Sequence, residues 1–247
     1  MIKAVKFMEN AIEIKGLLKK YGKCVAVNGI DLAVKSGELF ALLGENGAGK
    51  TTTIKVLCAL AGYDSGEVKV CGYDERTQAG EIRKIVNISP QETAVATKLT
   101  VKENLQLTAR LYGISDEKEK TENALAAFNL KDSENKLAKN LSGGMQRRLS
   151  LVMALVSEPK VLFLDEPTLG LDVRARRELW KEIVALKGKI TIILTTHYLE
   201  EAEALSDRVA IMKKGNILAL GTPEEIKSSV GETSFEEAFL KITEEKI

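Results

Sequence analysis

Apolar and polar residues alternate in two stretches near the N-terminus. The first covers residues 11–34, where Ile12 and Ile14 are separated by a charged residue, and the second covers residues 67–70. Such alternation is typical of strands that have one buried and one solvated face, as in antiparallel sheets. We therefore expect an antiparallel β-subdomain in the N-terminal part of the chain.

Short, nearly continuous apolar runs recur along the rest of the chain, with helical patterns between several of them. The runs cover residues 39–43, 85–88, 161–164, 190–194 and 209–212. Runs of this length are typical of buried strands in a mainly parallel, doubly wound sheet. A helix is predicted over residues 51–61, directly after the first run, with Gly62 as its C-terminal cap. The fold class is therefore α/β.

Residues 93–157 interrupt this rhythm with helices alone. The pair Thr100 and Glu103 forms a capping-box pattern that opens a helix, which Gly113 closes. Further helices are predicted over residues 116–128 and 145–156. We interpret this region as a helical subdomain inserted between two strands of the core.

The C-terminal region carries two more helix starts. Thr222-Pro223-x-Glu225 and Ser234-x-x-Glu237 are both capping patterns, and Phe235 and Phe239 are available to pack the helices. We expect four parts in the chain. They are residues 1–92 (the N-terminal core with its β-subdomain), 93–157 (the helical subdomain), 158–221 (the remainder of the core) and 222–247 (short helices).

Composition excludes several classes of protein. The 247 residues include 36 Lys and Arg and 35 Asp and Glu, so the net charge of +1 gives no support for nucleic-acid binding. The apolar stretches fall far short of the roughly 20 residues that cross a bilayer. Cys24, Cys58 and Cys71 are odd in number and form no C-x-x-C pair, which argues against a disulfide framework. The first residues lack the apolar region of a secretory signal, so we expect a cytoplasmic protein.

A glycine-rich segment follows the first apolar run and matches the phosphate-binding loop pattern G-x-x-x-x-G-K-[ST]. Its glycines let successive N–H groups point at phosphate oxygens, and the helix that follows adds partial positive charge. Lys50 would reach the β- and γ-phosphates, and the Thr51 hydroxyl would ligate Mg²⁺. The candidate nucleotide-binding residues here are Gly44, Glu45, Asn46, Gly47, Ala48, Gly49, Lys50, Thr51 and Thr52.

An acidic pair, Asp165 and Glu166, follows the run at residues 161–164. Taken alone, such a pair is more often a solvated turn. In a parallel sheet, however, ligands bind at the carboxyl ends of the strands, so the pair is expected to face the phosphate-binding loop. Asp165 would then hold Mg²⁺ through water, and Glu166 would polarise the water that attacks the γ-phosphate.

Two further strands end in polar residues. Residues 85–88 lead to Gln91, and residues 190–196 lead to His197, the only histidine in the chain. A lone histidine is usually structural, but the end of a parallel strand favours a role in the site. A metal site built from histidines is excluded, because there is no second histidine.

A second glycine-rich helix start is present at Leu141-Ser-Gly-Gly-Met-Gln146. Ser142 would cap the helix, and Gly143 and Gly144 would leave its N–H groups open to an anion. A plain capped helix explains the same residues equally well. One nucleotide in one chain needs only one such cradle, so the local chemistry leaves both interpretations open.

Together these segments resemble the ATP-binding subunit of ATP-binding cassette (ABC) transporters. The resemblance rests on Gly44–Thr51, Gln91, Leu141–Gln146, Leu162-Phe-Leu-Asp-Glu-Pro-Thr-Leu-Gly-Leu-Asp172 and His197, in that order, and covers roughly residues 12–227. It implies a P-loop NTPase core, with ATP and Mg²⁺ as cofactors. Met145 stands where the commonest signature has glutamine, which leaves the cradle chemistry unchanged. Residues 111–115, 197–202 and 234–239 resemble the drug-resistance and ABC-2 type exporter branch.

The resemblance also implies roles for individual residues. Two subunits would face each other head to tail, with the Ser142 cradle of one closing on the γ-phosphate held by the Lys50 loop of the other. Tyr21 would stack on adenine, although a half-buried strand tyrosine is the plain alternative. Gln91 would sense Mg²⁺ and the attacking water, His197 would touch the γ-phosphate, and Asp172 would contact the partner subunit.

The expected partners are a second copy of the chain, or a homologous ATPase subunit, and a separate transmembrane subunit docking between Gln91 and Leu105. This arrangement would place the chain at the cytoplasmic face of a membrane. A soluble ABC ATPase acting on nucleic acid or the ribosome is an alternative. Only 51 positions separate Gln91 from Ser142, too few for the long coiled coil of repair members, and there is one phosphate-binding loop. A small-molecule kinase or GTPase would leave Ser142 and His197 unexplained. Cargo, direction and the identity of the second subunit are not encoded in these motifs.

Overall fold

The computed structural model describes residues 9–244, and its centre is a six-stranded sheet. The strands lie in the order β10-β9-β3-β8-β7-β6, and all neighbours are parallel except β10 and β9. Their bounds are β3 Leu39–Leu43, β6 Val86–Ser89, β7 Val161–Asp165, β8 Thr191–Thr196, β9 Arg208–Lys213 and β10 Asn216–Gly221. The predicted α/β fold with a mainly parallel sheet is confirmed.

A second, antiparallel sheet is formed mainly by the N-terminal strands, in the order β2-β1-β4-β5. The strands are β1 Asn10–Tyr21, β2 Cys24–Lys35, β4 Ser65–Val70 and β5 Tyr73–Asp74. Ile12 of β1 lies opposite Val34 on one side and Val70 on the other, and all three side chains are buried. The alternation of apolar residues therefore predicts this sheet and its buried face correctly.

Helix α1 (Lys50–Leu57) packs between the two sheets. Ile54 and Leu57 belong to the same apolar cluster as Phe40 of β3 and Val68 of β4. The prediction that this helix continues to Ala61 and is capped by Gly62 is wrong, because its C-terminal cap is Cys58. Ala59 has a left-handed backbone (φ 52°), and the N–H groups of residues 60 and 61 both bond to the Lys55 carbonyl, so the helix ends earlier.

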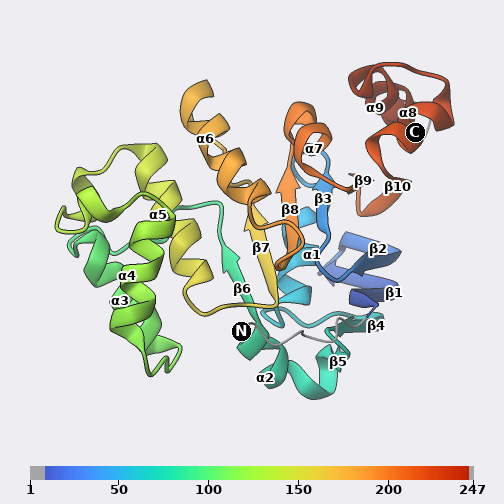
Figure 1. Cartoon of the computed structure of the whole chain (residues 1–247). Coiled ribbons are helices and arrows are strands. Elements are labelled where there is room, and N and C mark those ends of the chain that lie inside the picture. Colours follow the sequence, from blue (N-terminus) through green and yellow to red (C-terminus); the bar gives the residue numbers. More distant parts are fainter. Residues whose placement is uncertain (1–8, 245–247) are drawn as a thin grey trace.

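The region between β6 and β7 forms a helical lobe with a core of its own. It consists of α3 Val101–Leu111, α4 Glu117–Ala127, α5 Gly143–Leu155 and the 3₁₀ turns Lys131–Ser133 and Ala138–Asn140. Leu105, Leu125 and Leu149 come from the three helices and are buried together. The capping box of Thr100 and Glu103 is present as predicted. Figure 1 shows this lobe beside the β6 edge of the central sheet.

The remaining helices cover the core and the opposite edge of the sheet. They are α2 Glu75–Ile85, α6 Val173–Val184, α7 Leu199–Leu205, α8 Pro223–Val230 and α9 Phe235–Glu244. Phe235 is buried and Phe239 packs against the same cluster as Val209, as the sequence predicts. Figure 1 shows α8 and α9 at the end of the sheet away from the helical lobe. Strand β10, which leads into α8, is not anticipated by the sequence patterns.

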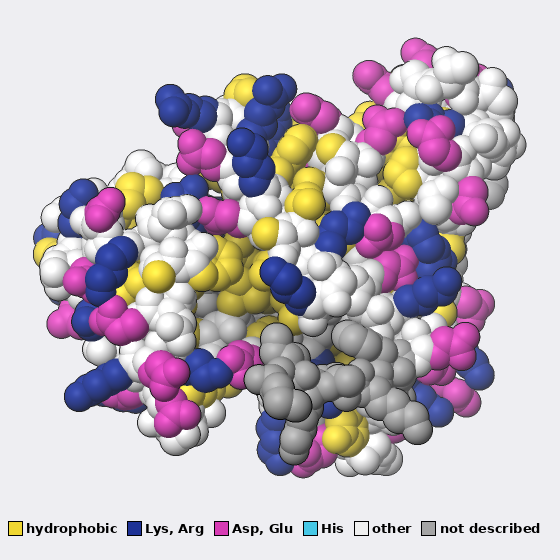
Figure 2. Space-filling model, viewed as in Figure 1, with side chains coloured by type: hydrophobic (Ala, Val, Ile, Leu, Met, Phe, Trp, Pro, Cys, Tyr) yellow, Lys and Arg dark blue, Asp and Glu magenta, His cyan; other side chains and the backbone are white. Residues whose placement is uncertain are grey.

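Charged side chains are interspersed over the visible face of the molecule. Figure 2 shows Lys and Arg side chains gathered over α6, with acidic side chains among them and over the neighbouring elements. Among residues 9–244, no helix has both the length and the apolarity that crossing a bilayer requires.

Candidate active site

The phosphate-binding loop connects β3 to α1 at the carboxyl end of the central strand. Gly49 precedes α1 with a left-handed backbone (φ 106°), and a Cβ there would lie 2.5 Å from the Ala26 carbonyl oxygen. A Cβ on Gly44 would collide with the Met212 carbonyl oxygen. Both glycines are therefore required by close approach of neighbouring backbone, and the loop has the position that the sequence predicts.

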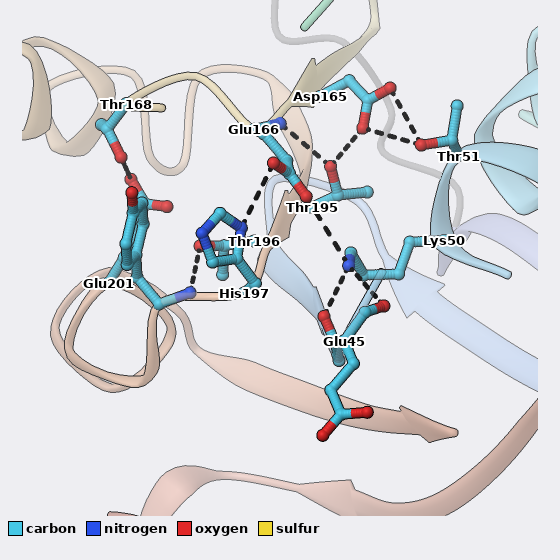
Figure 3. A network of polar contacts seen from close by, with 12 residues as sticks. Glu45, Lys50, Thr51, Asp165, Glu166, Thr168, Thr195, Thr196, His197 and Glu201 are labelled. Carbon is cyan, nitrogen blue, oxygen red and sulfur yellow. Dashed lines mark hydrogen bonds and ion pairs between the residues drawn. The ribbon is translucent and has the colours of Figure 1, made fainter. Parts of the chain in front are cut away.

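Lys50 is buried within this loop. Its Nζ donates to the carbonyl oxygens of Gly44 (2.5 Å) and Glu45 (3.2 Å) and lies 3.7 Å from Glu166 Oε1. Burial lowers the pKa of Lys50, and the carboxylates of Glu166 and Asp165 oppose that shift. The ammonium group is thus held at the centre of the loop, pointing toward the ends of β7 and β8 (Figure 3).

Asp165, the last residue of β7, faces the first turn of α1. The Thr51 hydroxyl donates to its carboxylate at 3.2 and 3.3 Å, and the Thr195 hydroxyl donates at 2.5 Å. Asp165 is 5% exposed, so the orientation of its carboxylate is fixed by these two hydroxyl groups. Thr51 and Asp165, two of the three residues expected to hold Mg²⁺, are therefore in direct contact.

Glu166 has an unusual backbone for a residue with a side chain. Its φ of 48° lies in the left-handed region, which costs about 1–3 kcal/mol outside glycine and persists only where neighbours enforce it. Its N–H bonds to both the carbonyl (3.1 Å) and the hydroxyl (3.0 Å) of Thr195. This conformation aims the carboxylate between Lys50 and His197, whose Nδ1 is 3.2 Å from Glu166 Oε2 (Figure 3).

Lys50, Thr51 and Glu166 border an open cleft of about 380 Å³, a volume suited to a small-molecule ligand. The lining consists of Cys24, Val25, Ala26, Glu45, Asn46, Gly47, Ala48, Gly49, Lys50, Thr51, Thr52, Gln91 and Glu166. Gln91 therefore joins the phosphate-binding loop and Glu166 at one cleft, whereas Asp165 and His197 are not part of its lining. In the described part of the chain, Tyr21 lies outside this lining. It pairs with Cys24 at the tip of the β1–β2 hairpin, is 51% exposed and carries Lys19 Nζ 4.8 Å from its ring centre.

The second glycine-rich start lies at the N-terminus of α5, away from that cleft. Ser142 Oγ accepts from the Met145 N–H at 3.3 Å, so the predicted cap is confirmed. A Cβ on Gly144 would lie 2.9 Å from Ala175 Cβ, whereas Gly143 faces open space. Ser142 and Gly144 line a separate cavity of about 70 Å³ against α6. Within one chain, Ser142 therefore does not meet the Lys50 loop.

Three polar residues close to the site carry no motif and are missed by the sequence analysis. Thr195 orients Asp165, and Arg147 of α5 donates to the Glu166 carbonyl at 2.8 Å. Glu201 of α7 is fully buried and accepts from Thr168 Oγ1 (2.8 Å) and Trp180 Nε1 (2.9 Å). Burial raises the pKa of Glu201. The one available signal was the position of Thr195 at the end of a strand, directly before Thr196 and His197.

Asp172, which the resemblance assigns to contact with a partner subunit, has a local role in this structure. Its Oδ1 accepts from the N–H groups of Arg174 and Ala175, both at 2.9 Å, and so caps α6. Such a cap contributes about 1 kcal/mol to helix stability.

Comparison with known proteins identifies the family. A family model described as ABC transporter matches residues 27–169. The daunorubicin resistance ATP-binding protein DrrA3 of Streptomyces coeruleorubidus is 41% identical over 226 residues, covering 90% of this chain and 72% of the relative. The Nod factor export ATP-binding protein I of Burkholderia orbicola is 42% identical, covering 89% and 74%. A solved structure described as the ATP binding subunit of an ABC transporter superposes with a TM-score of 0.84 at 30% identity, covering 95% of this chain and all of that one.

Proposed function

The chain belongs to the ABC transporter family as an ATP-hydrolysing subunit, and we propose that it drives export through a separate membrane subunit as one half of a head-to-tail pair. The observation that carries the proposal is that Lys50 and Glu166 line one cleft, with Asp165 bonded to Thr51 of the same lining and His197 beside Glu166. A cation for phosphate oxygens and a carboxylate for the attacking water are the two groups that hydrolysis of a phosphoanhydride needs at one place.

The residues at the end of β7 fit a magnesium ion. Mg²⁺ prefers oxygen ligands, and the Thr51 hydroxyl and the Asp165 carboxylate already lie within 3.3 Å of each other. The amide oxygen of Gln91, which borders the same cleft, is a third donor of this kind. When bound, the ion would neutralise charge on the β- and γ-phosphates. Thr51 and Asp165 are proposed to hold it, with Gln91 beside them.

Hydrolysis requires a water positioned for attack and an acceptor for its proton. We assign the acceptor to Glu166. As the water oxygen bonds to the γ-phosphorus, the bond to the bridging oxygen breaks, and ADP leaves with phosphate as the second product. Lys50 would supply positive charge to the phosphate oxygens, and His197, whose Nδ1 is 3.2 Å from Glu166 Oε2, would contact the γ-phosphate.

Ser142 does not border the cleft of its own chain. This supports the proposal that the glycine-rich segment at the start of α5 contacts the partner's nucleotide. In a head-to-tail pair, Ser142, Gly143 and Gly144 would close on the γ-phosphate held by the other Lys50 loop. Tyr21 is exposed at the hairpin next to Cys24, which lines the cleft, so its ring is available to stack on adenine.

The membrane partner and the direction of transport rest on the similar proteins. Two of these are named for daunorubicin resistance and for Nod factor export, which favours export over the alternative of a soluble ATPase acting on nucleic acid or the ribosome. We place the membrane subunit against the segment from Gln91 to Leu105, at the start of the helical lobe of residues 93–157. This contact would hold the chain at the cytoplasmic face of the membrane.

The change Glu166→Gln tests the proposed function directly. It keeps the size of the side chain and removes the basic oxygen, so the variant should bind ATP with Mg²⁺ and accumulate as an ATP-bound dimer without turnover. Phosphate release and size-exclusion chromatography would measure these outcomes. The exposed Glu67 on β4 provides the matched control, since Glu67→Gln should leave both unchanged. Near-normal hydrolysis by Glu166→Gln would remove Glu166 from the role of base.

A further inference from the structure

Arg147, in the second turn of α5, is a charged side chain that the proposed chemistry leaves unused. It is 3% exposed, and within residues 9–244 the hydrogen bonds of its guanidinium all go to backbone carbonyl oxygens. The acceptors are Pro167 for Nε (2.6 Å), Pro90 (2.5 Å) and Gln91 (3.0 Å) for Nη1, and Asp165 (3.0 Å) and Glu166 (2.8 Å) for Nη2. A guanidinium has five N–H donors, and these five carbonyl oxygens provide one acceptor for each of them.

These carbonyl groups belong to two segments of the cleft wall, and each segment follows a different strand. Pro90 and Gln91 follow β6, whereas Asp165 and Glu166 end β7 and begin the turn toward α6. The guanidinium is planar and rigid, so it fixes the distance and angle between the two segments. A single side chain from the helical lobe therefore sets where Gln91 stands relative to the acidic pair.

The hydrogen bond from Arg147 to the Glu166 carbonyl is the most important of the five, because Glu166 has a strained left-handed backbone. Thr195 fixes its N–H, and Arg147 fixes its carbonyl oxygen. The two contacts together determine the orientation of both peptide planes and so the direction in which the carboxylate leaves the backbone. Burial opposes the charge on Arg147, while Asp165, Glu201 and Glu166 favour it.

We propose that Arg147 is a positioning residue that carries movements of the α5 helix to Gln91 and Glu166 at once. Ser142 caps the same helix one and a half turns earlier, so a helix that moves as a unit links the two. When a partner's nucleotide binds at Ser142 and α5 moves, Arg147 would thus shift Gln91 and Glu166, the residues assigned to the attacking water. The inference rests on the proposed function, because it needs ATP hydrolysis in a head-to-tail pair.

Arg147→Lys and Arg147→Gln are the test variants, because lysine keeps the charge but cannot span two segments, and glutamine removes the charge. The purified chain of 247 residues is assayed for ATP affinity, kcat and melting temperature. We expect kcat to fall by about 10- to 100-fold in both variants, as for sub-ångström to ångström misplacement of reacting groups. ATP affinity should stay within about twofold, because the Lys50 loop is untouched.

Arg208→Gln is the matched control. Arg208 also donates to a backbone carbonyl, that of Ala33 (3.1 Å), but it lies at the start of β9 and does not border the cleft. Its loss should cost stability at most. Amide hydrogen exchange adds a readout independent of turnover, since residues 90–98 and 165–170 should exchange faster in the Arg147 variants alone. Free guanidinium should restore part of the kcat of Arg147→Ala.

The possible outcomes separate this inference from the proposed function. Wild-type chain that binds ATP but never hydrolyses it would contradict the proposed function. Active wild type with an Arg147→Lys kcat equal to that of Arg208→Gln would overturn the inference alone. A parallel loss of ATP affinity, melting temperature and kcat in the Arg147 variants would show a purely structural arginine and would also overturn it.

Discussion

Lys50 Nζ and Glu166 Oε1 lie 3.7 Å apart in the cleft, and each side chain is less than 10% exposed. The cation and the base that we propose for the site therefore share one buried environment, and each partly compensates the charge of the other. Loss of either group leaves its partner buried beside fewer opposite charges, which is costly in a protein interior. We therefore expect ATP binding and hydrolysis to be coupled through this pair.

The change Lys50→Ala should weaken ATP binding. A hydrogen bond to a charged group contributes about 1.5–3 kcal/mol, so Kd should rise roughly 10- to 150-fold. Isothermal titration with ATP and Mg²⁺ would measure the change. Lys55→Ala is the control, because Lys55 lies on the same helix but is exposed. Equal affinities for the two variants would contradict the assignment of the loop.

The change Ser142→Asp should prevent pairing while leaving the chain folded. Aspartate is as good a helix cap as serine, so the contact to the Met145 N–H is preserved. Its negative charge would repel the γ-phosphate that a partner presents. Nucleotide binding by the monomer should therefore be normal, and ATP-dependent dimers should be absent. Combining the change with Glu166→Gln, which is expected to accumulate as a dimer, would make this loss clear on size exclusion.

Ser142→Asn supplies the neutral control for this test. Asparagine also caps a helix well, so both variants should show similar melting temperatures. Dimers should persist in the asparagine variant more than in the aspartate variant, because only the latter adds charge. ATP-dependent dimers of equal amount in both variants would exclude Ser142 from the contact across the pair.

Local patterns of polarity were sufficient to predict the two sheets and the helical lobe. Side chains of β3 are all buried, and those of β1 and β2 largely alternate between buried and exposed positions. The pattern of apolar residues along a strand therefore indicates whether one face or both faces of its sheet are covered. The position of the acidic pair directly after a buried strand likewise predicted that Glu166 faces the Lys50 loop. Both signals are local in sequence or are tied to the carboxyl ends of parallel strands.

Contacts made by backbone groups could not be predicted in this way. The early end of α1 follows from the left-handed Ala59, a residue that rarely adopts that conformation. The role of Arg147 depends on where carbonyl oxygens of distant loops point, and no residue type encodes that direction. From the sequence alone, an arginine in the first turns of a helix is expected at the surface. Arg147 is buried because segments distant in the sequence pack around it.

Stability should depend on pH through the buried Glu201. Burial raises its pKa above the ordinary value of 4.5, so the folded chain binds the proton more tightly than the unfolded chain does. The free energy of unfolding therefore falls as pH rises. This contribution is fully present below about pH 4.5 and is lost as pH rises through the pKa of the folded state.

The change Glu201→Gln removes this titration while keeping an oxygen for Thr168 and Trp180. Wild type should lose stability relative to the variant as pH rises from about 4.5 to 7.5. Urea unfolding across that range would measure the difference. Glu200→Gln is the control, because Glu200 is exposed and pairs with Arg176 on the surface. A Glu201→Gln curve that stays parallel to wild type at every pH would show that Glu201 does not exchange a proton on folding in this range.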